Sequence, residues 1–492
     1  MIHICLYGDA AQADVDFLYL FIKSYYKTVC LLQRAERVDS MNKIYKVIWS
    51  KVRNCYVAVS EIAKRNGKSC TSVNYGAKAK RKRVALALSL ALCVTGGVFV
   101  SPQAAWADGT ITVSDAGQPQ NSTTTTGGTL SYDFNTRVYY STESSITELK
   151  ITGGQIDPYY GFAGCLLDGN VSGHTVTVSG TDTFVGSVCG GVTPFTDNTE
   201  HTVESNKVIV SGGKVDYVYG GMANSNNMTN FAKNNEVSIE AVLNGSEYTV
   251  TTKIFGGYAS KNGVITGNTV NIRKGKVNDV FGGYNYESGS VGGDEEGEGN
   301  KVTITGGTVM GSVYGGYVRA GTGSVIQNKV TIDTTESGTE VKVNNSIYGG
   351  FTSSESVSSN EVLIRGNKTT VDIIVGSNTV GVYGVYGGYS SVSGTASKNT
   401  VTISNEAEVK CYDVYGGYSV DGDAGGTSED EGNTVTVSDS TLTGYVIGGR
   451  SKNGNANYNS VTVNNSTLTS EGKNKFVQGG RAGDANVGSG TA

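Results

Sequence analysis

The sequence predicts an all-β fold, a right-handed parallel β-helix, for most of the chain. Its composition is rich in Gly, Ser, Thr, Val, Asn and Tyr, with only 4 Pro in 492 residues, which is typical of strands joined by many turns. One pattern recurs from His174 onward every 26 to 39 residues or so, a period found in solenoids and propellers. Within each unit apolar and polar residues alternate, as in a strand with one buried face.

The charge of the chain changes sign near Ala107. Up to that residue there are 16 Lys and Arg against 6 Asp and Glu, whereas 23 stand against 38 from Asp108 onward. The basic front and the acidic remainder therefore need separate interpretations. The remainder has no stripe of Lys and Arg, which argues against a nucleic-acid partner.

A signal peptide is predicted at 78–107. The apolar run VALALSLALCVTGGVFV at 84–100 follows the basic cluster KAKRKR at 78–83. After it the sequence Ala-Trp-Ala ends at Ala107, so cleavage is expected between Ala107 and Asp108. A transmembrane anchor is the alternative, but the run is close to the shortest that can span a bilayer.

An unusually long segment, 41–77, precedes this signal. It starts Met-Asn-Lys-Ile-Tyr-Lys and continues with Ile48-Trp49-Ser50 and Val-Ala-Val-Ser-Glu at 57–61. These residues resemble the extended signal peptide region of type V secretion proteins, the autotransporters and their relatives. The resemblance implies that the extension tunes export across the inner membrane, and that the Sec machinery and the outer-membrane assembly machinery are partners during export.

The natural start is expected at Met41, because such extensions begin at their own Met. Residues 1–40 are then an upstream extension with no role in the fold; a genuine additional amphipathic segment is the alternative. The signal region as a whole is expected to be helical or disordered.

The repeat begins with a polar residue, followed two and four positions later by Val or Ile. Asn tolerates a left-handed backbone and hydrogen-bonds its neighbours, so stacked coils are expected to form an Asn ladder at a turn. His174 occupies the same position ahead of the first unit. The leading residues are Asn206, Asn235, Asn268, Asn300, Asn328, Asn360, Asn399, Asn433 and Asn459.

A second mark of the repeat is an aromatic residue, Gly-Gly and a second aromatic residue. It is seen as Tyr314 to Tyr317, Phe281 to Tyr284, Tyr386 to Tyr389 and Tyr415 to Tyr418, with Tyr258 and Phe351 in the closing place; the last two units end in Arg450 and Arg481. Gly-Gly permits a sharp turn, and aromatic residues at equal positions are expected to stack along the solenoid. Packing is favoured over binding of sugars or partners.

A β-helix suits these facts because one unit cannot bury its apolar face alone, whereas a neighbouring coil can cover it. A β-propeller is the alternative fold, but no unit shows the four short strands of a blade. We assign 108–145 to a polar lead-in or cap and 146–492 to the repeat passenger. The pattern leaves open whether one unit makes one coil or two.

The acidic part contains Cys165, Cys189 and Cys411, and the first two could form a disulfide or stay reduced. Carboxylates gather in the stretches 292–300 and 421–433. Neither stretch has the spacing of an EF-hand, so solvated loops are favoured over calcium sites. No cofactor or metal is expected.

Catalytic residues are not expected either. A serine protease passenger would need a Gly-Asp-Ser-Gly loop, and the nearest string, at 422–425, has Ala in place of the nucleophile. His174 occupies the structural position and His201 is assigned to a loop. Carboxylate pairs such as Asp421 and Asp423 resemble those of glycan-acting enzymes but arise readily in an acidic chain.

The sequence therefore predicts a passenger that is exported through the inner membrane to the cell surface or outer membrane, or is secreted. It is expected to act as an adhesin or self-association module and not as an enzyme. The alternatives are a secreted β-helix enzyme acting on glycans and an inert surface stalk. A host surface, a glycan or another copy are the partners considered. The sequence ends at Ala492 without the β-barrel of an autotransporter. Truncation before that barrel is the interpretation, with two-partner and trimeric types as alternatives.

Overall fold

The computed structural model divides the chain into two units, Met1–Trp106 and Ala107–Ala492, each of which is described by itself. The structure describes residues 45–50, 55–60, 110–115, 124–126, 130–133, 138–141, 147–155, 161–166, 169–193, 200–224, 228–241, 243, 247–295, 297–335, 339–353, 355–367, 369–372, 383–469 and 477–483. The expected cleavage point between Ala107 and Asp108 lies outside these residues.

The described part of the first unit is a pair of antiparallel strands, β1 (Tyr45–Ser50) and β2 (Cys55–Ser60), in which Tyr45 lies opposite Ser60. The expectation of helix or disorder is wrong for these two segments. Both are rich in Val, Ile, Tyr and Trp, the β-branched and aromatic residues that favour strands.

The described residues of the second unit form three sheets. Sheet 1 is formed by β3 (Thr110–Asp115), β4 (Thr124–Thr126), β7 (Glu148–Ile151), β10 (Thr175–Val178), β13 (Lys207–Val210), β16 (Glu236–Ile239), β19 (Thr269–Ile272), β22 (Lys301–Ile304), β26 (Lys329–Asp333), β30 (Glu361–Arg365), β34 (Thr400–Ser404), β36 (Thr434–Ser438) and β38 (Ser460–Asn464). Sheet 3 is formed by β9 (Val171–Ser172), β12 (His201–Glu204), β15 (Asn230–Lys233), β18 (Gly263–Thr266), β21 (Gly289–Val291), β25 (Val325–Ile326), β29 (Val357–Ser358) and β33 (Ala396–Ser397).

Sheet 2 carries the Gly-Gly motifs. Its strands are β5 (Ser131–Asp133), β6 (Val138–Ser141), β8 (Gly161–Cys165), β11 (Phe184–Val192), β14 (Lys214–Ala223), β17 (Val250–Ala259), β20 (Lys276–Asn285), β23 (Gly307–Val309), β24 (Val313–Val318), β27 (Val341–Val343), β28 (Ile347–Thr352), β31 (Thr369–Asp372), β32 (Gly384–Ser390), β35 (Glu408–Ser419), β37 (Thr441–Ser451), β39 (Thr467–Thr469) and β40 (Val477–Ala482). One 3-10 turn, η2 (Glu429–Glu431), lies in the stretch 421–433.

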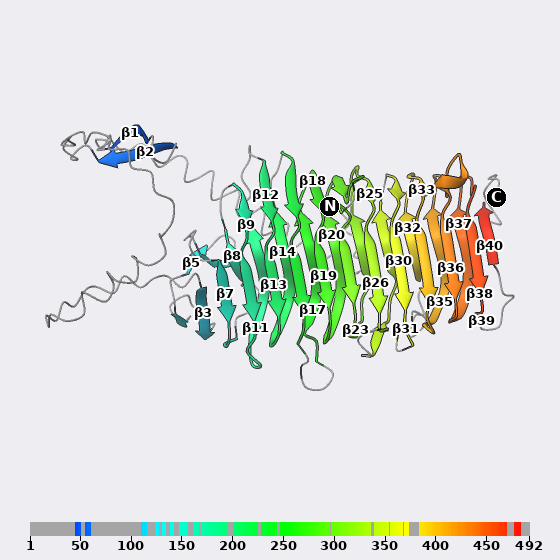
Figure 1. Cartoon of the computed structure of the whole chain (residues 1–492), viewed down its shortest axis with the longest axis horizontal. Helices are drawn as coiled ribbons and strands as arrows, with labels where there is room; N and C mark the ends of the chain where they lie inside the picture. The colour runs from blue at the N-terminus through cyan, green and yellow to red at the C-terminus, as the bar shows by residue number, and fades with distance from the viewer. Residues whose placement is uncertain are drawn as a thin grey trace, which may run out of the picture. The chain divides into compact units, whose positions relative to one another are not determined.

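Consecutive strands visit sheets 1, 2 and 3 in turn and then return to sheet 1 one coil further on. Thus β13 leads through β14 and β15 to β16, and each strand pairs in parallel with its counterpart in the next coil. The coils follow one another in chain order from cyan to red (Figure 1). This arrangement confirms the parallel β-helix, and one repeat unit makes one coil. The propeller alternative is wrong, because the sheets run along the repeat and are not confined to one unit.

Two antiparallel strands lie at the N-terminal edge of the sheets. In sheet 1, β3 pairs in parallel with β7, and β4 then pairs antiparallel with β3. In sheet 2, β5 pairs antiparallel with β6. Ile111 and Val113 of β3 are fully buried, so the segment assigned as a polar lead-in contributes a strand to the solenoid.

Two apolar cores run along the solenoid. The larger fills the space between sheet 1 and the first halves of the sheet 2 strands, and Val and Ile make up most of it. Its members include Val208 and Val210 of β13 and Val277 and Val280 of β20, all with 0% exposure. A smaller core of Val, Ile and Ala lies against sheet 3. Full burial of one such side chain stabilises the fold by about 1.5–3 kcal/mol before the cost of ordering.

The Asn ladder is confirmed, and it runs through the interior beside these cores. In each rung the side-chain Nδ2 donates to Oδ1 of the Asn one coil later, as Asn300 does to Asn328 at 2.8 Å. The backbone N of Asn300 donates to the same oxygen at 3.0 Å. Nδ2 also donates to a carbonyl in sheet 3, here that of Ile265 at 2.8 Å. At the first rung the backbone N of His174 donates to Oδ1 of Asn206.

The left-handed backbone expected for the ladder Asn occurs instead at the residue before it. Ser205, Asn234, Gln327 and Ser359 have φ between 53° and 58°, and each immediately precedes a ladder residue. The turn is therefore made before the strand starts. The ladder Asn is then free to aim its amide inward, where it joins successive coils.

The Gly-Gly pair forms the surface on which the ladder lies. A Cβ on Gly316 would lie 2.5 Å from Nδ2 of Asn328, and one on Gly315 would lie 2.4 Å from the carbonyl oxygen of Gly349 in the next coil. Neither approach is possible for a residue with a side chain. Both positions therefore require glycine because another group lies too close for a side chain. At Gly316 that group is the ladder Asn, and at Gly315 it is the backbone of the next coil.

Candidate functional site

The aromatic residues of the repeat lie on the outer side of sheet 2. In a regular strand, residues three apart point to opposite faces. Here Gly315 and Gly316 both face the ladder, so Tyr314 and Tyr317 on either side of them share the outer face. Their rings meet edge to face, with centroids 4.9 Å apart and planes at 78°.

These rings form two columns along the solenoid, which confirms the predicted stacking. Neighbouring centroids lie 4.8–5.5 Å apart, and the planes are within 18° of parallel. The first column comprises Tyr219, Phe255, Phe281, Tyr314, Tyr348, Tyr386 and Tyr415; the second comprises Tyr258, Tyr284, Tyr317, Phe351, Tyr389 and Tyr418.

Stacking covers the faces of the rings inside each column. Tyr386 and Tyr415 are fully buried, and Tyr317 and Tyr389 of the second column are partly exposed. A sugar ring binds an aromatic residue through an open face, and in the interior of these columns each face contacts another ring. Burial, with neighbouring tyrosines contributing, raises the pKa of Tyr386 well above its ordinary value. The columns therefore have the character of a packed structural element.

At the C-terminal end, the second column continues with arginine. The Arg450 guanidinium carbon lies 5.4 Å from the Tyr418 ring centroid, and its Nη1 donates to the Tyr415 hydroxyl at 3.0 Å. That hydroxyl donates to the carboxylate of Asp413. In the next coil Arg481 lies in register with Arg450.

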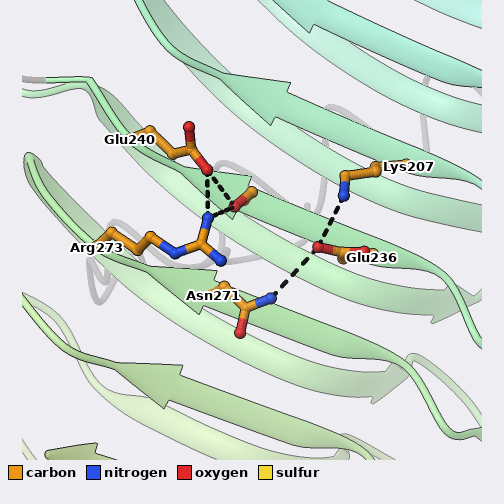
Figure 2. A network of polar contacts seen from close by, with 6 residues as sticks. Lys207, Glu236, Glu240, Asn271 and Arg273 are labelled. Carbon is orange, nitrogen blue, oxygen red and sulfur yellow. Dashed lines mark hydrogen bonds and ion pairs between the residues drawn. The ribbon is translucent and has the colours of Figure 1, made fainter. Parts of the chain in front are cut away.

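The outer face of sheet 1 carries polar side chains, several of which join adjacent coils (Figure 2). Lys207 and Glu236 form an ion pair at 3.1 Å, and Asn271 donates to the same carboxylate at 3.5 Å. Arg273 contacts both Glu240 and Ser238. These groups are exposed enough that each ion pair contributes less than about 1 kcal/mol.

Farther along sheet 1 the outer face loses its charges. The outward positions of β34, β36 and β38 carry Thr, Ser and Asn, and Thr434 and Ser460 hydrogen-bond across the coils at 3.1 Å. Residues facing the core stay apolar throughout, whereas the exposed position after the ladder Asn is occupied by Lys, Glu, Thr or Ser. In sheet 1 the outward-facing residues thus vary from coil to coil, while the core-facing residues stay apolar.

The acidic stretches are held by their own hydrogen bonds. Glu298 accepts from the backbone N of Glu295, and Glu431 accepts from the N and Oγ1 of Thr427. Those bonds lower the pKa of the Glu431 carboxyl. Asp421 and Asp423 accept hydrogen bonds from Asn453 and from the backbone N of Asn455 in the next coil. Within the described residues no group of three or more His, Cys, Asp and Glu is placed to hold a metal ion.

The two histidines of the passenger occupy structural positions. His174 is 7% exposed and stands at the ladder. His201 begins β12, where it lies opposite Asn230 and is 0% exposed, so its assignment to a loop is wrong. The strands of sheet 3 are too short to reveal themselves by alternation, which explains the error.

The three cysteines of the passenger are free and buried. Cys189 pairs with Ala163, two residues before Cys165. Such diagonal neighbours have Cα atoms roughly 8 Å apart, beyond the reach of a disulfide. Burial raises the pKa of the Cys165 thiol to about 11 and that of Cys189 to about 12. Both thiols are therefore unreactive in the folded chain.

Fold and surface together define a repetitive β-helix passenger carried behind an export signal. Residues 41–95 match the family described as the extended signal peptide of the type V secretion system. This match indicates the type V secretion route, with export across the inner membrane to the cell surface, the outer membrane or the medium. The Sec machinery and the outer-membrane export machinery serve this route.

Neither a curated protein nor a solved structure matches the chain. In the part that the structure describes, no helix has the length and apolar character needed to cross a bilayer.

Proposed function

We propose that this chain displays its β-helix on the cell surface as an adhesin or a self-association module. The observation that supports this proposal is that the core-facing residues of sheet 1 stay Val or Ile from β10 to β38, whereas the outward-facing residues change. Val follows the ladder Asn on the core side in coil after coil, while the exposed neighbour changes from Lys207 to Glu236 to Thr269. The outer face of sheet 1 therefore offers many weak polar contacts along its length, which favours multivalent binding.

Enzymatic activity is not part of this proposal. The described histidines and the carboxylates of Asp421 and Asp423 are engaged in turns, in the ladder or in buried strands. A glycan-acting enzyme remains the alternative. Release of sugar from a panel of glycans by the exported chain would favour it over our proposal.

The proposal is tested with cells that export the full chain and with matched cells in which 146–492 is deleted. Export of the full chain is expected to increase attachment to host cells, or aggregation of the bacteria, above the deleted control. Equal attachment and equal aggregation in the two strains would favour an inert stalk. Surface labelling of both strains serves as the control for display.

A further inference from the structure

We propose that Tyr415 is a redox site, at which an outer-sphere one-electron oxidant leaves a neutral tyrosyl radical. The hydroxyl of Tyr415 donates to the Asp413 carboxylate and accepts a hydrogen bond from Nη1 of Arg450 at 3.0 Å. The ring is fully buried at the C-terminal end of the first column, where it stacks on Tyr386 with centroids 5.2 Å apart. A buried phenol thus lies in contact with both a base and a hydrogen-bond donor.

The carboxylate decides where the oxidation settles. Loss of one electron turns a phenol into a radical cation, which is a strong acid, and burial makes that cation costly to keep. At Tyr415 the proton moves along the existing hydrogen bond from Oη to Oδ2 of Asp413. The products are the neutral radical, a protonated Asp413 and the oxidant reduced by one electron, so atoms and charge balance. The oxygen of the radical keeps the hydrogen bond from Arg450.

Tyr386 is the internal comparison, because it lies one coil earlier in the same column and is also fully buried. Its hydroxyl has no hydrogen-bond partner in the part of the chain that the structure describes. Oxidation of Tyr386 leaves the proton without an acceptor, so the positive charge stays in an apolar site. An electron vacancy formed on Tyr386 is therefore expected to move to the stacked Tyr415 ring, where the proton can be transferred.

The second column connects this buried ring with the surface. Tyr389 is partly exposed, and its ring stacks on that of Tyr418 with centroids 4.9 Å apart. Tyr418 in turn meets the Tyr415 ring edge to face at 5.3 Å. Because electrons move readily between aromatic rings in contact, an oxidant that reaches Tyr389 withdraws an electron from Tyr415 without entering the core. Burial then keeps the radical away from solvent.

The test oxidises the purified full chain with tris(bipyridine)ruthenium(III), generated by a light flash in the presence of persulfate, and records high-field EPR spectra of the frozen sample. We expect a tyrosyl radical whose g tensor shows a hydrogen bond to the radical oxygen, as the Arg450 contact requires. Tyr415→Phe keeps the ring and its stacking and is expected to remove this signal. Asp413→Asn keeps the shape of the acceptor without its basicity and is expected to lower the radical yield several-fold.

Tyr386→Phe is the matched control, because it removes a buried hydroxyl of the same column and leaves both hydrogen-bond partners of Tyr415 in place. It is expected to keep the radical signal, since the contact of Tyr418 with Tyr415 is intact. Far-UV circular dichroism verifies folding, and Asp413→Asn decides if Tyr415→Phe does not fold. Absence of the radical in the unaltered chain, an undiminished signal in Tyr415→Phe, an equal yield in Asp413→Asn or an equal loss in Tyr386→Phe would overturn the site. The measurement involves no cell attachment, so this inference stands or falls independently of the proposed function.

Discussion

The ladder makes a quantitative prediction for Asn328→Ala. Asn328 is fully buried, and its Oδ1 accepts from both the backbone N and Nδ2 of Asn300. Its Nδ2 donates to the carbonyls of Val291 and Ile326 and to Oδ1 of Asn360, at 2.9–3.0 Å. Alanine removes all five bonds.

The main cost falls on Asn300, whose buried backbone N–H loses the acceptor. Leaving such a donor unsatisfied costs about 1–3 kcal/mol, and each further lost hydrogen bond about 1 kcal/mol. With one unsatisfied donor and four further lost bonds, we expect the free energy of unfolding to fall by about 5–7 kcal/mol. The fall should appear as a lower urea midpoint in far-UV circular dichroism of the full chain.

Thr331→Ala is the matched control, because Thr331 lies on the same strand, β26, and faces outward. It is expected to change stability by less than about 0.5 kcal/mol. Equal midpoints for the two variants would refute the view that the ladder stabilises the solenoid. Because coils contact only their neighbours, a broadened transition for Asn328→Ala would indicate local unravelling around this coil.

Four further outcomes are expected. Tyr386→Phe should raise the urea midpoint, by roughly 1–2 kcal/mol in stability, because the Tyr386 hydroxyl is buried without a partner among the described residues; a lower midpoint would contradict this. The contribution of Tyr389 to stability should be constant below about pH 10 and be lost between about pH 10 and 12, since burial raises its pKa to about 12 while the unfolded phenol ionises near 10; Tyr389→Phe should make the alkaline fall in stability shallower in pH-dependent melts. Cys165 and Cys189 should resist a thiol reagent in the folded chain and react once it is denatured, whereas a disulfide would leave them unreactive in both states under non-reducing conditions. N-terminal sequencing of the exported protein should begin at Asp108, and any upstream peptide in the mature form would contradict cleavage there.

The sequence indicated the ladder because the same amide recurs at one position ahead of a two-residue alternation. It did not indicate which residue takes the left-handed turn. Ser205 and Asn234 differ in type but share that conformation, so the turn is set by where the chain must enter the strand. Local preference alone is too weak to decide between adjacent positions.

The aromatic motif was only partly predictable for a similar reason. Stacking between coils follows from equal spacing, whereas the edge-to-face contact of Tyr314 with Tyr317 requires both to share one face. Alternation in a regular strand would separate them. The bend at Gly-Gly overrides the alternation, because the ladder on the inner side occupies the space that any Cβ would need.

The sequence by itself determined the export route and the repeat. The export signal is recognised from the linear sequence of residues 41–95, and periodic Asn and Gly-Gly residues reveal stacked coils. Only the tertiary structure decided which side chains of neighbouring coils contact each other. Cys189 lies opposite Ala163, two residues from Cys165. The faces of the stacked rings are covered by other rings, and Arg450 lies opposite Arg481 on the neighbouring strand. These outcomes depend on the register between coils far apart in sequence, which backbone pairing across the whole sheet sets and no single unit encodes.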